Sequence, residues 1–273
     1  MQMMFFCPYW GQQHVGIEAF AKKVKAAGYE GVEMALPSDD SKRERTVAVL
    51  RDYDLTLIAQ HHETHLRDWE AHKQAYEQCL RHLAAAKPLL INAHTGKDYF
   101  SFEQNAALIE LAGSVADETG VRILHETHRG RFSFAAHVTQ RYLETLEDLT
   151  LTLDLSHWCN VAESMLEDQT EAVELALSRC AYFHARVGFA EGPQITDPRA
   201  PEWQDTVVCH LQWWDQILEY ALQRGDMVFP IAPEFGPFPY LQHLPFTQMP
   251  LANQWEINCY MKDLLTERYQ SKL

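Results

Sequence analysis

Short apolar runs alternate with longer segments of helical periodicity along the whole chain. In residues 16–27, for example, Ile17, Phe20 and Val24 recur at the spacing that places side chains on one face of a helix. The shorter, uniformly apolar runs are typical of buried parallel strands. We predict strands near residues 3–7, 31–34, 55–59, 89–94, 121–128, 151–157, 181–184 and 227–234. We predict helices near residues 16–27, 39–51, 68–87, 102–118, 134–146, 163–179, 203–223 and 251–269.

This alternation predicts the fold class. Strand–helix units of about 30 residues, repeated along the chain, are expected of a parallel (β/α)₈ TIM barrel. A doubly wound open sheet is the competing architecture, but no Gly-x-Gly-x-x-Gly motif follows the first predicted strand. The 273 residues contain no Ser/Gly-rich linker, so we expect residues 1–273 to form a single barrel domain.

The amino-acid composition argues against some classes of binding partner and cellular location. The net charge of −15 argues against a surface that binds nucleic acid or an anionic membrane. No uninterrupted apolar run approaches the roughly 20 residues of a membrane span. The six cysteines are scattered without a CxxC pair, which fits reduced thiols in a cytoplasmic protein. We read the apolar residues 1–10, which lack a basic segment, as a first strand rather than a signal peptide.

Four of the predicted strands end in a side chain that commonly binds metals. These side chains are Glu126, Asp154, His184 and Glu234. The carboxyl ends of barrel strands meet at one rim, and unpaired buried carboxylates are costly, so we expect one shared site. Three carboxylates and an imidazole favour Mn²⁺, Mg²⁺ or Co²⁺, with Zn²⁺ as a further option. The predicted cofactor is therefore one divalent metal ion.

The motifs at these strand ends resemble those of the xylose isomerase-like TIM-barrel superfamily. The matching segments are His-Glu-Thr-His at 125–128, Asp-Leu-Ser-His at 154–157, His-Ala-Arg at 184–186 and Pro-Glu-Phe-Gly at 233–236. Each motif is short, but four of them fall in the fifth to eighth strands in order. The superfamily holds sugar isomerases, sugar and sugar-phosphate epimerases, and abasic-site DNA endonucleases. The resemblance covers nearly the whole chain.

The resemblance implies a set of functional residues. Its metal ligands would be Glu126, Asp154, His184 and Glu234. In epimerising members Glu126 and Glu234 would also be the catalytic acid and base, and His157 and Arg186 would contact oxygens of the substrate. The implied function is a metal-dependent isomerase or epimerase of a small sugar or sugar-like polyol. It would transfer a proton through a metal-stabilised enediolate, because inversion at a carbon needs a base on one face and an acid on the other.

Further candidate residues would lie at the same rim. His62 and His94 end the third and fourth predicted strands, and Trp10 follows the first, where it can stack on a sugar face. In the endonuclease branch, histidines at such positions help to hold extra zinc ions, so a metal-cluster phosphodiesterase is an alternative. The loop at residues 186–198 lacks the Asp-x-His pair of that branch, and the acidic net charge does not suit DNA.

Other interpretations stay open at this stage. A dehydratase acting on a polyol or keto-cyclitol uses the same superfamily and metal. A non-catalytic sugar- or metal-binding module would leave a gap in the ligand set, and the sequence has none.

Some residues near the predicted site have two possible roles. Arg129 and Arg131 can bind a phosphate or carboxylate of the substrate, or lie in a solvated loop. By strand alternation His125 points away from Glu126. Trp213 can belong to the outer core layer or to a homo-oligomer contact.

Overall fold

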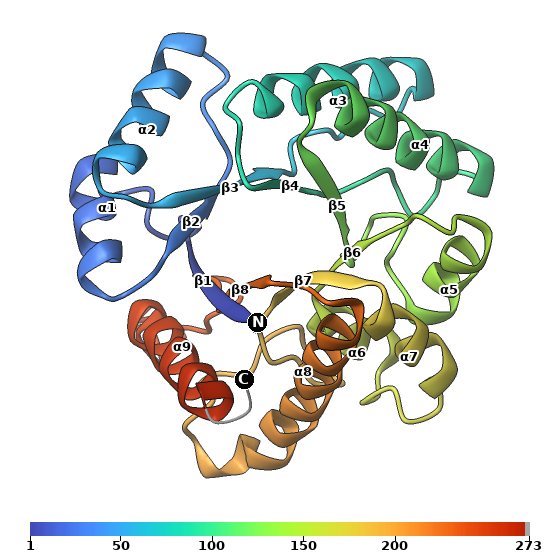
Figure 1. Ribbon diagram of the computed structural model, residues 1–273. Coiled ribbons are helices and arrows are strands. Elements are labelled where there is room, and N and C mark those ends of the chain that lie inside the picture. The colour runs from blue at the N-terminus through green and yellow to red at the C-terminus, as the bar shows by residue number, and fades with distance from the viewer. Residues whose placement is uncertain (271–273) are drawn as a thin grey trace.

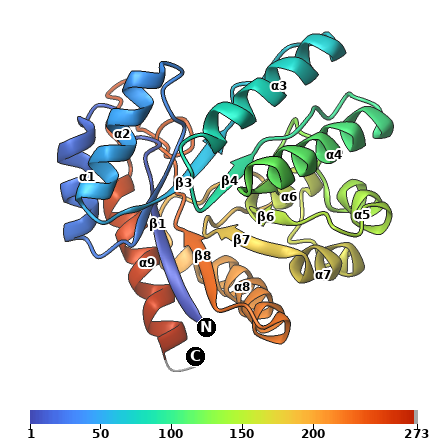
Figure 2. The same ribbon diagram turned by 45° about the horizontal axis from the view of Figure 1, so that its top comes forward.

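The computed structural model describes residues 1–270, and in this range eight parallel strands close into a barrel in sequence order (Figure 1). The strands are β1 (Gln2–Pro8), β2 (Gly31–Met34), β3 (Thr56–His61), β4 (Leu90–Ala93), β5 (Arg122–Glu126), β6 (Leu151–Leu153), β7 (Cys180–His184) and β8 (Val228–Ala232). The helices form a ring around them (Figure 2). They are α1 (Ile17–Ala26), α2 (Asp40–Asp52), α3 (Trp69–Ala84), α4 (Phe102–Thr119), α5 (Ala136–Thr145), α6 (Leu155–Ala162), α7 (Thr170–Ser178), α8 (Gln204–Arg224) and α9 (Gln254–Gln270). The predicted (β/α)₈ TIM barrel is confirmed.

Local sequence signals explain where several helices begin and end. Asp39 and Asp68 cap α2 and α3 by accepting hydrogen bonds from backbone N–H groups of the first turn. Ser101 and Gln104 form a capping box at the start of α4, which ends at Gly120 in the left-handed conformation. These signals lie within one turn of each helix end, so they can be recognised without knowing the fold.

The prediction of the sixth strand–helix unit was partly wrong. Strand β6 ends at Leu153, and the unpredicted helix α6 begins directly after it. The predicted helix at 163–179 is α7, which starts only at Thr170. The reason is Asp154, whose side chain accepts a hydrogen bond from the backbone N–H of Ser156 and so caps α6. Asp154 therefore combines the role of a helix cap with a place at the barrel rim.

Two apolar layers hold the barrel together. The larger one lies between the strands and the helices, where Trp214 of α8 stacks on Phe183 with ring centroids 5.6 Å apart. The interior of the barrel is filled by Phe6, Ile58, Leu90, Leu124, Tyr182 and Ala232. Side chains two residues apart on a strand point to the same face. Glu126 and His184 therefore lie directly above Leu124 and Tyr182 inside the barrel.

None of the helices within residues 1–270 is both long enough and apolar enough to span a bilayer. All six cysteines are free thiols.

The interior layer leaves no room for a side chain at Gly31 of β2. A Cβ there would lie 2.4 Å from the carbonyl oxygen of Thr56 and 2.4 Å from the ring of Phe6. We expect Gly31→Ala to lower the free energy of unfolding by about 1–3 kcal/mol, because the added methyl group overpacks a rigid interior. Urea denaturation followed by circular dichroism measures this change.

Gly113→Ala is the matched control. Apart from its chain neighbours and the backbone of its own helix, a Cβ at Gly113, inside α4, would meet no atom of the described residues within 4 Å. Alanine is the better helix former by about 1 kcal/mol, so this variant should be as stable as the parent or more stable. Equal destabilisation by both substitutions would contradict the packing argument.

Candidate metal centre

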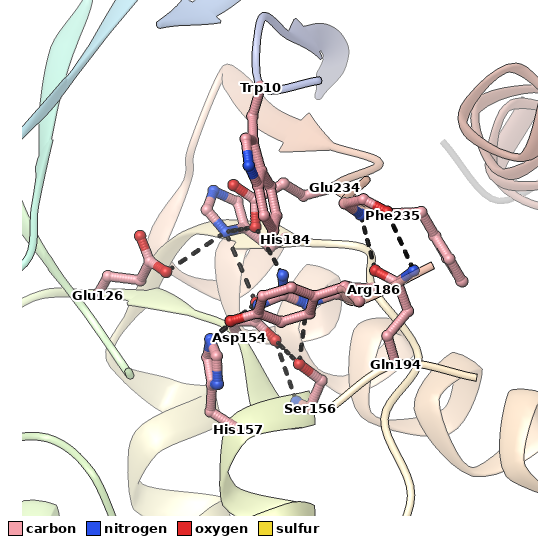
Figure 3. Close-up of polar contacts among 12 residues, drawn as sticks. Trp10, Glu126, Asp154, Ser156, His157, His184, Arg186, Gln194, Glu234 and Phe235 are labelled. Atoms are coloured by element: carbon pink, nitrogen blue, oxygen red, sulfur yellow. Dashed lines mark hydrogen bonds and ion pairs between the residues drawn. The ribbon is translucent and has the colours of Figure 1, made fainter. Parts of the chain in front are cut away.

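The structure brings the four predicted metal ligands together at the carboxyl end of the barrel (Figure 3). The Nδ1 atom of His184 lies 3.1 Å from Oε2 of Glu234, 3.7 Å from Oε1 of Glu126 and 3.8 Å from Oδ2 of Asp154. All four side chains are almost fully buried. One possible ligand atom from each of the four residues lies within 4.8 Å of those of the other three. These distances are expected of a site for a single metal ion.

The imidazole of His184 indicates that this cluster suits a cation. Its Nδ1 atom is buried and has no hydrogen-bond partner within residues 1–270, although carboxylate oxygens surround it. Burial would lower the pKa of His184, but Glu234, Glu33 and Glu126 raise it well above its ordinary value. Burial also raises the pKa values of Glu126 and Glu234, since their charges are unfavourable there without compensation. A divalent ion at the same place would supply that compensation, so the donor set fits one.

A further buried carboxylate, Glu33 of β2, was missed in the sequence. Its Oε2 atom lies 3.0 Å from Nε2 of His184 and accepts a hydrogen bond of 2.8 Å from the hydroxyl of Tyr182. Asn92 donates to its Oε1 at 2.9 Å. Glu33 therefore fixes His184 from the side opposite the cluster and leaves Nδ1 directed at the other carboxylates. The available signal was a charged residue in the middle of the predicted buried strand at 31–34.

The positive charge of Arg186 lies between two of the predicted metal ligands, Asp154 and Glu234. Its Nη2 donates to Oδ2 of Asp154, its Nε donates to Oγ of Ser156 at 3.1 Å, and its Nη1 lies 3.4 Å from Oε2 of Glu234. Burial raises the pKa of Asp154, but Arg186 and His184 together hold it well below the usual range. His157 is fully buried with its Nε2 atom 2.8 Å from Nη2 of Arg186, and does not line the cavity described below. The predicted contact of His157 with substrate would therefore require Arg186 to move.

Glu126 uses its two carboxylate oxygens differently. Oε1 faces His184, whereas Oε2 lies 2.9 Å from Nε2 of His94 and accepts a hydrogen bond of 2.7 Å from Asn92. His94, Asn92 and Leu90 lie two residues apart along β4 and just beyond it, so all three face the interior. Asn92 bonds to both Glu33 and Glu126, and this shared amide fixes the two carboxylates relative to each other.

A cavity of about 300 Å³ opens above the cluster. Of the predicted substrate-binding residues, Trp10, His62, His94 and Arg186 line it, together with Glu126 and Glu234. The ring of Trp10 packs edge-on against Tyr240, with centroids 5.0 Å apart. Gly236 makes room for this ring, since a Cβ there would lie 2.2 Å from it. His125, which was not predicted to belong to the site, does not line this cavity. Its Nδ1 atom lies 2.7 Å from Oγ1 of Thr95.

Fold and site together define a class of protein, a parallel barrel with a carboxylate-rich rim. The sequence model of the xylose isomerase-like TIM barrel family matches residues 21–196, and the chain belongs to this family. No curated protein matches the sequence closely enough to be counted as a relative.

Solved structures share the fold at low sequence identity. The structure is similar to D-allulose 3-epimerase from Methylomonas sp., with 17% identity, a TM-score of 0.64 and 98% of each chain covered. It is similar to mannonate dehydratase from Streptococcus suis, with 13% identity and a TM-score of 0.63, covering 100% of this chain and 96% of that one. It also resembles endonuclease IV from Thermus thermophilus, with 15% identity and a TM-score of 0.56, covering 98% and 100%. The neighbours thus include epimerases, dehydratases and a nuclease.

We expect divalent metal to stabilise the protein through the four-residue cluster. At about 100 times the dissociation constant, bound Mn²⁺ should add about 2.7 kcal/mol to the free energy of unfolding. Asp154→Asn should lose most of this gain but keep the cap of α6, because an amide oxygen also accepts from Ser156. Differential scanning fluorimetry with and without Mn²⁺ measures the shift in Tm, and exposed Asp117→Asn is the control. A wild-type shift that persists in Asp154→Asn would place the metal elsewhere.

We expect Glu33 to strengthen metal binding without contacting the metal. Glu33→Gln should weaken Mn²⁺ binding about 10- to 100-fold, because a neutral amide holds and polarises His184 less than a carboxylate does. Isothermal titration calorimetry gives the dissociation constant, and the d–d spectrum of the Co²⁺-loaded protein reports the altered ligand field. Exposed Glu267→Gln serves as the control. An unchanged Mn²⁺ affinity in folded Glu33→Gln would refute this role.

Proposed function

We propose that the protein is a divalent-metal-dependent isomerase or epimerase of a small sugar or sugar-like polyol. The observation that carries the proposal is the position of Glu126 and Glu234. Both glutamates line one cavity, and both approach Nδ1 of His184, at 3.7 Å and 3.1 Å (Figure 3). They come from β5 and from the segment after β8, so they reach the cavity from two different elements of the barrel.

Two carboxylates in this arrangement suit proton transfer at a carbon beside a carbonyl. Inversion requires one group to remove the proton from one face and another to return a proton to the opposite face. A divalent ion held by Glu126, Asp154, His184 and Glu234 would acidify that proton and stabilise the charge of the enediolate. The oxygen-rich donor set supports Mn²⁺, Mg²⁺ or Co²⁺ as the ion, with Zn²⁺ as a further option.

The remaining lining residues suit a polyhydroxylated substrate. His62 and His94 offer ring nitrogens to hydroxyl groups, and Trp10 with Tyr240 offers aromatic surface to a sugar face. Arg186 lies 5.0 Å from the ring centroid of Tyr240 and keeps its charge between Asp154 and Glu234. The cavity is at the small end of the range for ligand sites, which supports a substrate the size of a monosaccharide.

The dehydratase alternative uses the same residues. One carboxylate would remove a proton and another would protonate a departing hydroxyl group, so the geometry alone supports both reactions. The product separates them, because a dehydratase releases water and an unsaturated or keto product. The epimerase and dehydratase structures that resemble this chain are 17% and 13% identical to it, so the likeness is one of fold.

The metal-cluster phosphodiesterase is supported less well. His94, Glu126 and His128 form a further cluster of metal-ligand side chains, in which the rings of His94 and His128 are tilted by 33° with centroids 4.3 Å apart. Nε2 of His94 lies 2.9 Å from Oε2 of Glu126, so these two ligand atoms already contact each other. The net charge of −15 is also unfavourable for binding a DNA backbone.

We expect the Mn²⁺-loaded protein to exchange a substrate proton with solvent. A ketohexose panel incubated in D₂O should acquire deuterium at one carbon, detected by NMR and mass spectrometry. Glu126→Gln and Glu234→Gln should each reduce this exchange by at least about 10²-fold, because each removes one partner of the proton transfer. Their circular dichroism should remain native.

Exposed Glu267→Gln is the control and should exchange at the parental rate. Wild-type exchange in either active-site variant would remove that glutamate from the acid/base pair. Turnover without deuterium in the product would replace proton transfer by a hydride shift.

A further inference from the structure

One side of the cavity carries positive charge that the proton-transfer reaction does not use. Arg131 lines the cavity and is 4% exposed. Its Nη1 donates to the carbonyl oxygens of Thr64 at 3.1 Å and Gly96 at 3.4 Å, and its Nη2 donates to that of His62 at 2.9 Å. Arg131 is therefore not part of a solvated loop. Its guanidinium is fixed between the segments that follow β3 and β4.

Arg131 forms no ion pair with a carboxylate in the described part of the chain. Within residues 1–270, no carboxylate oxygen lies within 4.0 Å of its guanidinium nitrogens, whereas Arg186 contacts both Asp154 and Glu234. The three hydrogen bonds to carbonyls leave further N–H donors of the guanidinium unused. A buried charge without a counter-charge is costly, so the arrangement favours binding of an anion.

A second cation lies beside Arg131. The ammonium group of Lys97 lies 3.1 Å from Nδ1 of His65. His65 lines the cavity, whereas Lys97 is not one of its lining residues and adjoins it through His65. No carboxylate oxygen in the described chain lies within 4.0 Å of Lys97 either. Burial lowers the pKa of Lys97, and the nearby charge of Arg131 lowers it further. Two cations are thus held close together in a protein whose net charge is −15.

We propose that Arg131, Lys97 and His65 form an anion-binding corner for a carboxylate or phosphate group of the substrate. This inference rests on the proposed function, since Glu126 and Glu234 line the same cavity of about 300 Å³ as Arg131. The substrate then has a polyol end at the metal cluster and an anionic end at Arg131. A guanidinium and an ammonium suit both oxyanions, so the substrate is a sugar acid or a sugar phosphate.

Binding of three ketohexose derivatives tests this corner. D-fructose is the neutral probe, 5-keto-D-gluconate carries a carboxylate, and D-fructose 6-phosphate carries a phosphate. Isothermal titration calorimetry at fixed ionic strength, with Mn²⁺ and again with EDTA, gives each dissociation constant. At least one anionic probe should bind about tenfold tighter than D-fructose in both conditions, and the tighter anion identifies the group. Dependence on Mn²⁺ alone would assign the preference to the metal and overturn the proposal.

Two variants connect the preference to the named residues. Lys97→Gln and Arg131→Gln should each reduce the affinity for the preferred anion about tenfold, the scale of one charge-assisted hydrogen bond, and reduce the affinity for D-fructose less. Arg131 also donates hydrogen bonds to three backbone carbonyl groups, so its substitution can destabilise the fold. Lys97→Gln keeps the test valid if Arg131→Gln does not fold. Exposed Lys42→Gln makes the same charge change outside the cavity and should alter nothing.

The proposal is overturned if neither anion binds more tightly than D-fructose, or if the preference survives in folded Lys97→Gln. Deuterium exchange by the Mn²⁺-loaded wild type is measured separately, so the proposed function and the anion-binding corner can fail independently.

Discussion

The rest of the site depends on the neutralisation of four carboxylates buried in the barrel. Glu33, Glu126, Asp154 and Glu234 surround His184 at distances of 3.0–3.8 Å. In a medium of low polarity such a concentration of negative charge is unfavourable unless cations share it. Arg186 compensates part of the charge through Asp154 and Glu234, and a divalent ion at Nδ1 of His184 would compensate more. This one electrostatic requirement accounts for the convergence of residues that lie far apart in the chain.

The charged side chains at and beside the cavity differ in whether they contact an opposite charge. Glu126 and Glu234 each lie within 4.0 Å of His184, whereas Arg131 and Lys97 have no carboxylate oxygen within 4.0 Å in the described chain. The same cavity is therefore lined by carboxylates and by an arginine that contacts no carboxylate in the described chain. The proposed substrate has a polyol end at Glu126 and Glu234 and an anionic end at Arg131, and it has to fit a cavity of about 300 Å³.

Much of the barrel follows from local patterns. The eight strands and most helix ends were predictable because apolar periodicity, caps and glycines act within a few residues. The region after β6 was not predicted correctly, since Asp154 ends a strand and caps a helix at once, which the apolar pattern does not reveal. Glu33 was missed for a related reason. Its partners His184 and Tyr182 lie about 150 residues away, and only barrel closure brings them together.

The sequence by itself determined which residue types end each strand, and strand alternation then dictated that Glu126 and His184 face the same side as Leu124 and Tyr182. Tertiary structure alone decided the pairing of charges: Arg186 contacts Asp154, whereas Arg131 donates to carbonyl groups and contacts no carboxylate within residues 1–270. The physical reason is range. Periodicity and capping depend on neighbours along the chain, but the Coulomb energy of a side chain depends on distances that exist only after the barrel has closed.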